Sequence, residues 1–449
     1  MRYLPLGPSD RAEMLAKIGV DHIDDLFQDV PEGALLKQPV DLPRHASEMD
    51  VERQMTAFAD KNIPAGSVPF FCGAGAYRHY VPSTVDYMIQ RGEFLTAYTP
   101  YQPEISQGTL QTLFEFQTQV AQITGMEVSN ASMYDGSTAC GEAVLMARRA
   151  SRKKRAILSG TLHPQYVEVV KCVTKFTDDL AVVNPLDMFS VDALIDQIDD
   201  ETSCVVVQNP DFFGNIQDYS KLADALHARK ALLIVVVTEV VSLGAVRSPG
   251  SMGADIVVCE GQSIGNGLSF GGPYVGLLAT RQKYVRTMPG RVCGETVDAD
   301  GKRGYVLTLS TREQHIRREK ATSNICTNAG LCTLAFTIHM TLLGEKGFRH
   351  LARLNHAKAV MLADKLEAID GIEVLNDSFF NEFTLALPMD AAEAIERLAD
   401  VEVIGGVPLS RLYPHDPAMK NRMLVAVTET VTDNDMDRLV QELKELVNA

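Results

Sequence analysis

The stretch SCVVVQNPDFFGNIQDYSKLADALHARKALLIVVV, residues 203–237, decides the class of fold that the chain can adopt. It contains two continuous apolar runs, residues 204–207 and 231–237, and between them a segment at 219–230 that is typical of a short helix. A strand that is covered on both faces is expected to be apolar throughout, as in a parallel sheet. The stretch therefore predicts a strand, a crossover helix and a second strand of the same sheet.

The same alternation of strands and helices extends along the chain on both sides of this stretch. Further short apolar runs predict strands at residues 155–160, 180–185, 254–259 and 271–281. An amphipathic pattern predicts a helix at 106–125, and further helices are predicted at 136–151, 163–176 and 191–199. This order predicts an α/β domain with a mostly parallel sheet and right-handed crossovers.

The chain divides into three predicted parts. Residues 1–60 hold short helices, one of them capped by Ser47, that cannot bury a core of their own, so we expect an N-terminal arm laid over a larger body. Residues 61–325 form the large α/β domain, and its charged segment 286–322 contains a turn suited to a hairpin. Residues 326–449 begin with a long helix and continue as a small α+β domain.

Length, charge and cysteine spacing exclude several classes of function. At 449 residues and 49.2 kDa the chain is too long for one compact core, which favours two domains with extensions. Its net charge of −16 disfavours nucleic acids and anionic membrane surfaces as partners, because both require a basic face. No apolar segment is long enough to span a membrane, and eight scattered cysteines without metal-ligand spacing favour buried free thiols in a reducing cytoplasm.

Three loops are expected at the carboxyl ends of strands, where ligands of open α/β sheets bind. A plain turn is the favoured interpretation of one of them, QNPDFFGNIQD at 208–218, which leaves two candidates. Gly136, Ser137 and Thr138 open a predicted helix whose first amide groups can hold a phosphate or another anion. Capping of that helix by Ser137 or Thr138 is the alternative. The second loop, within CEGQSIGNGLSFGGPYVG at 259–276, contains neither lysine nor histidine.

The order of these elements resembles the large domain of the pyridoxal-phosphate enzymes with the aspartate-aminotransferase fold, fold type I. That chemistry needs a lysine to form an imine and an acid to pair with the pyridinium nitrogen. The resemblance places the acid near Thr238 or Glu239 and the lysine near Gln262 or Ser263. Glutamine cannot form an imine, and Lys283 follows a further strand. We therefore expect a degenerate site, including the phosphate loop, on an intact fold.

Three longer phrases resemble the glycine cleavage system P-protein family: FLTAYTPYQPEISQGTLQTLFEFQTQVAQITGM (94–126), ASMYDGSTACGEAVLMARR (131–149) and KATSNICTNAGL (320–331). The resemblance covers essentially the whole chain and is to the amino-terminal half of that protein, which in many bacteria is a separate subunit 1. It implies a lysine-bearing subunit 2 that holds pyridoxal 5'-phosphate, in a heterotetramer with two copies of each subunit. The implied reaction decarboxylates glycine and passes the aminomethyl group to the lipoyl group of the H-protein.

The resemblance also implies that two loops reach the active site of the partner. The residues concerned are Tyr98, Tyr101, Gln102, Thr322, Ser323 and Asn324. The alternative for the tyrosines is that they cover their own core. The second trio is expected to open the long helix and hold a phosphate of the other subunit, with simple N-capping as the alternative. The basic run at 312–320 can steer an acidic partner or form a solvated helix face.

Two other functions stay open from the residues alone. A regulatory or scaffold paralogue would have kept the fold and lost the reaction. A self-sufficient pyridoxal-phosphate enzyme would carry its lysine at a position that the pattern does not identify. Under the leading prediction the isolated chain is inactive and completes the active site of its partner.

Overall fold

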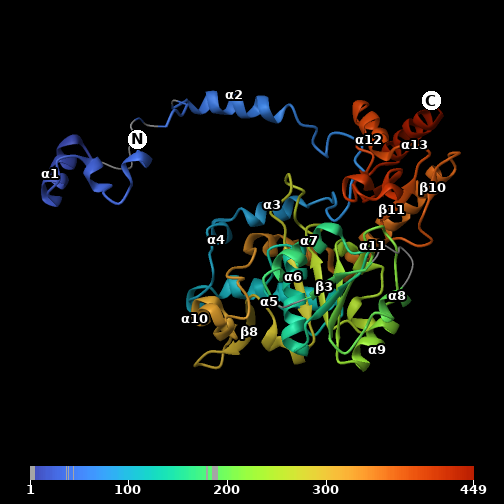
Figure 1. Ribbon diagram of the computed structural model, residues 1–449, viewed down its shortest axis with the longest axis horizontal. Helices are drawn as coiled ribbons and strands as arrows, with labels where there is room; N and C mark the ends of the chain where they lie inside the picture. The colour runs from blue at the N-terminus through green and yellow to red at the C-terminus, as the bar shows by residue number, and fades with distance from the viewer. Residues whose placement is uncertain are drawn as a thin grey trace. The chain divides into compact units, whose positions relative to one another are not determined.

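The computed structural model divides the chain into two compact units, residues 1–63 and 64–449. The residues that it describes are 6–36, 38, 40–43, 45–177, 180–184 and 191–448. The first unit contains α1 (Pro8–Ile18) and α2 (Glu48–Ala59) (Figure 1). Ser47 caps α2 as predicted, because its hydroxyl accepts a hydrogen bond from the amide of Asp50.

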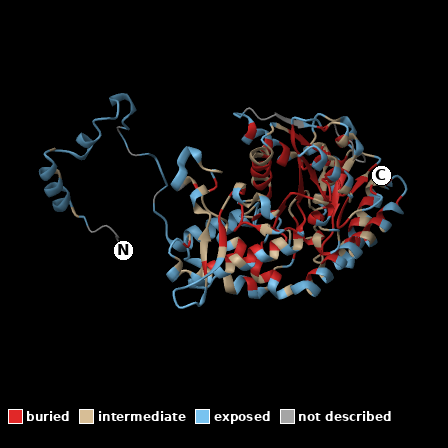
Figure 2. Ribbon diagram, turned by 90° about the horizontal axis from the view of Figure 1, so that it is seen from below, coloured by how far each residue is buried: buried red, intermediate tan, exposed pale blue. Residues whose placement is uncertain are grey.

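The first unit has no core of its own. None of its described residues is buried (Figure 2), and the apolar side chains of α2 are at least 45% exposed. Two short helices cannot bury enough apolar surface to offset the entropy of ordering them. The arm that the sequence predicts therefore has exposed apolar side chains, and its packing over a larger body stays a prediction.

The second unit is built around a sheet of seven described strands in the order β1-β7-β6-β5-β4-β2-β3. Their bounds are β1 (Val128–Ser129), β2 (Arg155–Leu158), β3 (Leu180–Val183), β4 (Thr202–Gln208), β5 (Leu232–Val237), β6 (Ile256–Glu260) and β7 (Gly276–Thr280). The pairs β2–β3, β2–β4, β4–β5 and β5–β6 are parallel, and β7 pairs antiparallel with β6 and β1. The mostly parallel sheet is confirmed.

Alternation of side chains along the strands explains why these strands are apolar throughout. In β4 and β5, Val205, Leu233 and Val235 join a core with α5, α9 and α11, whereas Val206 and Ile234 face a second core with α6 and α7. The helices of this unit are α3 (Ser83–Ile89), α4 (Gly92–Leu95), α5 (Gln107–Thr124), α6 (Gly136–Ser151), α7 (Pro164–Thr174), α8 (Asp192–Ile195), α9 (Ser220–Ala228), α10 (Gln314–Arg317), α11 (Gly330–Glu367), α12 (Ala391–Asp400) and α13 (Asp433–Asn448). Both faces of the sheet are thus covered, as a parallel sheet requires.

The predicted hairpin and long helix are both present. Strands β8 (Val292–Val297) and β9 (Arg303–Thr308) pair antiparallel across the turn. Helix α11 begins at Gly330, and its helical dihedral angles are interrupted at Gly344. None of the helices among the described residues is both long and apolar enough to cross a membrane.

A small antiparallel sheet follows α11, in the order β10-β11-β13-β12. Its strands are β10 (Glu373–Val374), β11 (Glu382–Ala386), β12 (Val407–Pro408) and β13 (Arg422–Ala426). Phe71 joins this sheet from far away in the sequence, since its amide donates to Ile404 O and its carbonyl accepts from Ala426 N. The chain then runs from the small sheet towards the large one, which positions residues 73–79 for the site described below.

The eight cysteines are all free thiols. The prediction that they are buried holds for Cys140, Cys204, Cys259 and Cys293. It is wrong for Cys172, which is exposed on α7, because its position falls on the solvent side of that helix.

The core predicts a specific loss of stability. Leu233→Ala removes a fully buried side chain from β5, so the free energy of unfolding should fall by about 2–5 kcal/mol. Urea unfolding measures this loss, and Leu342→Ala on α11, where the side chain is 52% exposed, is the control with an expected change of about 0.5 kcal/mol or less. Equal losses in the two variants would contradict this description of the core.

Candidate functional site

The candidate site lies at the carboxyl ends of β4, β5 and β6, where the N-terminus of α6 also arrives. Gln208 ends β4, and its side-chain amide donates to Thr238 Oγ1, just beyond β5, at 3.2 Å. Glu260 ends β6 and accepts a hydrogen bond from Gly136 N, at the start of α6, at 2.9 Å. The structure therefore brings the region of Thr238, the loop at 136–138 and the loop after β6 to one edge of the sheet.

Gln262 and Ser263 are the positions near which the resemblance expects the imine-forming lysine, and Gln262 is bonded within the chain. Its side chain is buried, its Oε1 accepts from Tyr77 N at 2.9 Å, and its Nε2 donates to Tyr77 O and to Asn266 O at 2.9 Å each. A carboxamide cannot replace the amine in imine formation. Lys283 cannot do so either, because its Nζ lies 3.6 Å from Asp255, which precedes β6 at the opposite end of the strand.

The N-terminus of α6 is capped by its own chain. Asp135 is the N-cap, and its Oδ1 accepts from Ser137 N at 2.8 Å and from Thr138 N at 3.0 Å. The N-cap itself lies one residue before Gly136, and Thr138 takes part as the N3 residue of a capping box, since its hydroxyl accepts from Asp135 N at 3.4 Å; Ser137 is not the N-cap. A helix start binds phosphate through amide groups such as those of Ser137 and Thr138. Here they already donate hydrogen bonds to the carboxylate of Asp135.

Glu260 fills the remaining position at this helix start. Its carboxyl group accepts from the amides of Gly136, Gln262 and Val275 at 2.9, 3.1 and 3.2 Å. Burial raises the pKa of Glu260 to about 8, although its bonds to backbone amides act in the opposite direction. A phosphate group would have to displace Asp135 and Glu260 together to reach these amides.

A buried imidazolium lies beyond the end of β5. His79 Nε2 lies 2.9 Å from Glu239 Oε2, and its Nδ1 lies 2.9 Å from Glu429 Oε2. Burial by itself lowers the pKa of His79, but the two carboxylates outweigh it and raise that pKa to about 10. Glu239 also accepts from Val241 N, so its carboxylate is already paired and is not available as a pyridinium partner.

Residues 73–79 close the space between the two sheets. Tyr77 donates its hydroxyl to Glu382 Oε2 at 2.8 Å, and Ala74 N donates to Glu382 Oε1 at 2.6 Å. At Gly73 a Cβ atom would lie 2.7 Å from Ala426 Cβ, so the backbone passes too close to β13 for a larger residue. The side chains at this edge therefore bond to one another.

The residues present do not fit a covalently held pyridoxal phosphate. An open cleft of about 640 Å³ remains beside the α6 N-terminus, and its lining holds Asp135, Glu260, His163 and Tyr166 but no lysine among the described residues. Thr238, at one of the two positions predicted for the pyridinium acid, carries no charge, and the amides at the start of α6 are bonded to Asp135 and Glu260. No described group of three or more His, Cys, Asp or Glu residues is arranged to hold a metal.

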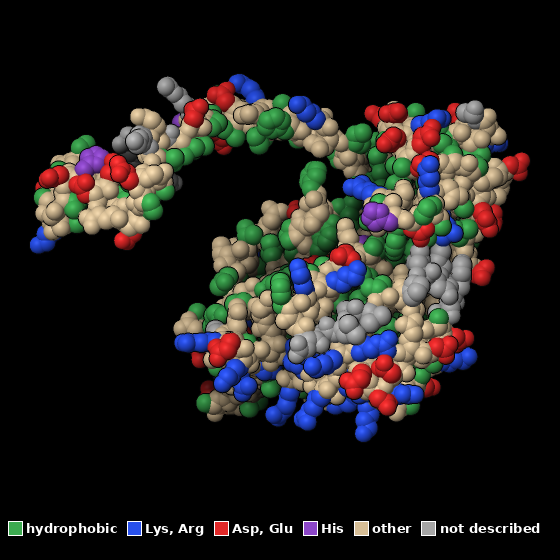
Figure 3. All heavy atoms as spheres, viewed as in Figure 1, with side chains coloured by type: hydrophobic (Ala, Val, Ile, Leu, Met, Phe, Trp, Pro, Cys, Tyr) green, Lys and Arg blue, Asp and Glu red, His purple; other side chains and the backbone are tan. Residues whose placement is uncertain are grey.

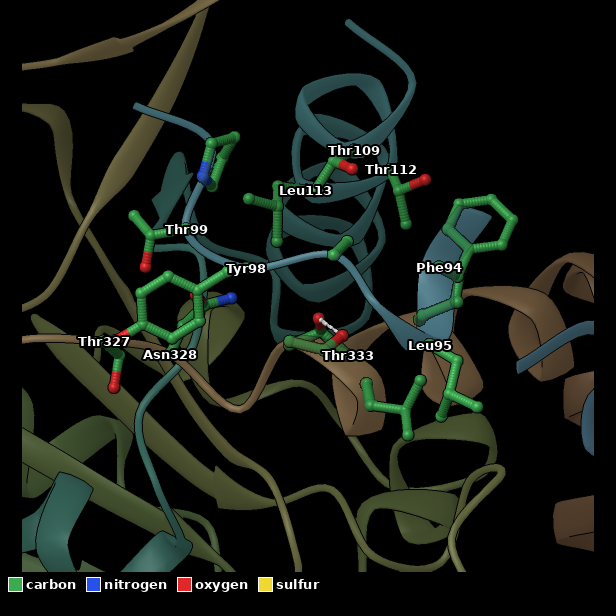
Figure 4. Close-up of a pocket in the computed structure, with 15 residues that line it drawn as sticks. Phe94, Leu95, Tyr98, Thr99, Thr109, Thr112, Leu113, Thr327, Asn328 and Thr333 are labelled. Atoms are coloured by element: carbon green, nitrogen blue, oxygen red, sulfur yellow. Dashed lines mark hydrogen bonds between the residues drawn. The ribbon is translucent and has the colours of Figure 1, made fainter. Parts of the chain in front are cut away.

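The predicted loop at residues 98–102 lies away from this edge. Tyr98 is 80% exposed and Tyr101 is 53% exposed, so the alternative that these tyrosines cover their own core is wrong. Figure 4 shows Tyr98 lining a cavity of about 200 Å³ together with Phe94, Leu113 and Asn328. Gln102 is exposed and precedes a short 3-10 helix.

Thr322, Ser323 and Asn324 do not open the long helix, which corrects the prediction. Helix α11 begins at Gly330, and residues 321–329 are irregular. Tertiary bonds explain the later start, because Ala329 N donates to Ser132 Oγ at 3.0 Å. The trio instead lines a second cleft, of about 590 Å³, with Tyr134, Thr138 and Glu142 among the other walls.

The basic run at 312–320 is not one continuous helix face. It contains the end of one 3-10 helix, the four-residue helix α10 and another 3-10 helix. Arg312 donates to the carbonyls of Met288, Gly290 and Leu309, so this arginine holds the backbone together. Arg318 lines the second cleft.

Sequence reasoning missed three residues that organise these places. Asp135 was detectable, because an aspartate immediately before a helix start is a common N-cap. His79 and Arg291 carried no local signal, since His79 pairs with Glu239 and Glu429, which lie 160 and 350 positions away. Arg291, whose Nη2 donates to Tyr101 Oη at 2.9 Å, is likewise 190 positions from its partner.

Comparison with known proteins identifies the family of the chain. Residues 1–443 match the model of the glycine cleavage system P-protein family. The chain is 62% identical, over the full length of both, to a Parvibaculum lavamentivorans protein named probable glycine dehydrogenase (decarboxylating) subunit 1. A solved glycine decarboxylase (P-protein), in inhibitor-bound form, is 39% identical with a TM-score of 0.87 over 99% of this chain and 100% of that one.

A more distant neighbour supports the fold alone. The sphingosine-1-phosphate lyase from Burkholderia pseudomallei is 14% identical, with a TM-score of 0.67 over 93% of each chain. The fold is that of the type I pyridoxal-phosphate-dependent enzymes, as predicted. Within that class, the chain belongs to the glycine cleavage system P-protein family.

Restoring the lysine should not restore the coenzyme site. In Gln262→Lys, the helix amides stay bonded to Asp135 and Glu260, and Thr238 still offers no acid, so we expect no stoichiometric imine with added pyridoxal phosphate. A spectral titration of the purified variant against the unsubstituted chain measures this. An imine absorbance that appears only in the variant and saturates at one coenzyme per chain would refute the description of the site.

The pairing of His79 predicts how stability depends on pH. Its pKa is about 10 in the folded chain and about 6.5 when unfolded, so the folded state binds the extra proton between these values. The stabilisation that the protonated His79 gives to the folded state is complete below about pH 6.5 and is lost as the pH rises to about 10. Between pH 7 and 10, the free energy of unfolding measured with urea should decline less steeply in His79→Gln than in the unsubstituted chain. The two slopes should differ by up to about 1.4 kcal/mol per pH unit. Identical slopes for both proteins would contradict the pairing.

Proposed function

We propose that the chain is subunit 1 of glycine dehydrogenase (aminomethyl-transferring), the decarboxylating enzyme of the glycine cleavage system. The name subunit 1 in its relatives implies a partner subunit. Under the proposal, this chain joins a lysine-bearing subunit 2 in a heterotetramer with two copies of each. The complex decarboxylates glycine and transfers the aminomethyl group to the lipoyl group of the H-protein.

One observation carries the proposal. A chain that belongs to this family has Gln262 at the lysine position and carboxylates on the amides that would hold the phosphate. Its own edge of the sheet therefore favours internal packing over coenzyme binding. The pyridoxal 5'-phosphate of the reaction would then be held by the partner, and this chain would contribute walls to the partner's active site.

The exposed aromatic residues of the second unit suit such a contribution. Large exposed apolar patches on a soluble protein mark interaction sites. The exposed large apolar side chains around α3, α4 and the following loop are Tyr80, Tyr87, Leu95, Tyr98, Tyr101 and Ile105. Hydrophobic side chains gather over α3 and α4 on the face shown in Figure 3. Tyr98, Tyr101 and Gln102 are therefore proposed to face the partner, where they would exclude water from its active site.

The loop at residues 322–324 is proposed to face the partner through its side chains. Thr322 and Ser323 are half-buried, Asn324 is exposed, and all three line the cleft that is proposed to receive a phosphate of the other subunit. Ser323 Oγ accepts from Ile325 N at 3.1 Å, so its hydroxyl proton, now directed to Glu142, would have to turn towards the phosphate. Burial raises the pKa of Glu142 in the same lining, whereas its hydrogen bond with Ser323 acts in the opposite direction. The contact would not use the dipole of α11, because that helix begins at Gly330.

A cytoplasmic location is also proposed. All eight cysteines are free, and free thiols are typical of proteins in a reducing compartment.

Reconstitution tests the proposal. The purified chain, the lysine-bearing subunit and pyridoxal phosphate are assayed separately and together for exchange of labelled bicarbonate into glycine. We expect activity from the mixture at least about 100-fold above either subunit alone. No gain on mixing would favour a regulatory or scaffold protein, and full activity of this chain alone with the coenzyme would show a self-sufficient enzyme.

The position of Ser323 predicts a defect in the assembled enzyme. Ser323→Ala removes one hydroxyl from the cleft, so exchange activity should fall about tenfold, as expected for the loss of a charge-assisted hydrogen bond in the reacting state. Size-exclusion chromatography should show unchanged assembly. Ser251→Ala, on the exposed 3-10 helix before β6, is the matched control with unchanged activity. Equal activities of the two variants would remove Ser323 from the proposed site.

A further inference from the structure

Arg291 is one of the most deeply buried charged side chains of the molecule. It immediately precedes β8, is 2% exposed, and its carbonyl accepts from Ala131 N at 2.8 Å. Removing a guanidinium group from water costs several kcal/mol unless its donors are paired. The groups that its donors meet therefore indicate what the residue does.

The donors of Arg291 reach into the loop that carries the exposed tyrosines. Its Nη2 donates to Tyr101 Oη at 2.9 Å, its Nη1 donates to Thr99 Oγ1 at 3.2 Å, and its Nε lies 3.4 Å from Glu313 Oε2. The guanidinium carbon also lies 5.3 Å from the centre of the Tyr101 ring. Glu313 is itself buried, so its carboxylate balances the charge of Arg291 within the protein.

The planar fork of arginine makes this arrangement possible. Two hydroxyl groups, two residues apart on the loop, are held by two nitrogens of one rigid group. The backbone bonds of the loop are local, from Ala97 N to Phe94 O and from Tyr101 N to Thr99 O. The arginine is therefore a link between the loop and the body of the protein.

The loop in turn lines the cavity shown in Figure 4. Tyr98, Thr99 and Pro100 line it from the loop, with Leu113 of α5 and Asn328 before α11 among the other walls. Arg291 holds the hydroxyl group of Thr99, and Tyr98 directly precedes Thr99. The bond to Arg291 therefore limits where the Tyr98 ring can lie. Side chains on an anchored loop lose less entropy when they meet a partner.

We propose that Arg291 is a positioning residue for the reaction: it fixes Thr99 and Tyr101 so that the loop at 97–102 presents Tyr98 to the partner's active site. The inference rests on the proposed function for its catalytic consequence. The mechanical part, that Arg291 orders the loop, concerns this chain alone and can be measured without the partner.

The first measurement is hydrogen exchange of the isolated chain. Arg291→Lys keeps the charge beside Glu313, but a single ammonium cannot span both hydroxyls, so amides at 97–102 should exchange about tenfold faster. Arg303→Lys is the matched control, because Arg303 also stacks on a tyrosine at 5.3 Å and pairs with a carboxylate, but on the exposed hairpin. Unchanged exchange at 97–102 in Arg291→Lys would overturn the proposal.

The second measurement uses the reconstituted complex. Arg291→Lys should lower kcat/KM for exchange about tenfold with assembly unchanged, whereas Arg303→Lys should stay within about twofold. Adding Tyr101→Phe to Arg291→Lys should cause little further loss, because both remove the same bond. Losses that multiply, or full activity of Arg291→Lys, would overturn the positioning role.

A third variant tests the proposal even if Arg291→Lys does not fold. Thr99→Val combined with Tyr101→Phe removes both loop hydroxyls and leaves the Arg291–Glu313 pair in place, and it should reproduce the faster exchange and the lower activity. If the loop is released as expected but the unsubstituted chain never activates its partner, the proposed function fails while the anchoring by Arg291 stands.

Discussion

The backbone amides at the start of α6 are bonded to side-chain carboxyl groups of the same chain, Asp135 and Glu260, and the proposed division of labour between two subunits depends on these bonds. Asp135 holds the amides of Ser137 and Thr138, and Glu260 holds that of Gly136. A helix N-terminus of this kind is a ready site for an anion, so its occupation from within removes the main attraction for a phosphate group. The absence of a lysine from the loop at 259–276 thus accompanies a second feature, amides at the start of α6 that are bonded within the chain.

The charges at this edge are balanced internally. His79 lies between Glu239 and Glu429, and Tyr77 donates to Glu382. Glu239 follows β5 of the large sheet, whereas Glu382 belongs to β11 of the small sheet. The same contacts that fill the former site therefore join the two sheets, so this edge contributes to stability. Under the proposed function, contributions to a shared reaction come from the exposed loops, above all the loop at 97–102 that Arg291 is proposed to position.

The sequence predicted the fold well because the strands of a covered parallel sheet are apolar throughout, as β4 and β5 are. The sequence also shows that the loop after β6 holds no lysine, and the assignment of Gln262 to the imine position stays a prediction. Sequence reasoning failed at the start of α11, where Thr322–Asn324 have good capping side chains but tertiary bonds such as that of Ala329 to Ser132 delay the helix. The partners of His79 and Arg291 could not be predicted, because those pairs are distant in the sequence and depend on the assembled fold.

Reduction of the assembled complex with borohydride tests the central claim most directly. The two subunits are mixed with one equivalent of pyridoxal phosphate per pair, reduced, separated and weighed by mass spectrometry. The account predicts one reduced coenzyme adduct on each lysine-bearing subunit and no stoichiometric adduct on this chain. A stoichiometric adduct on a lysine of this chain would contradict it.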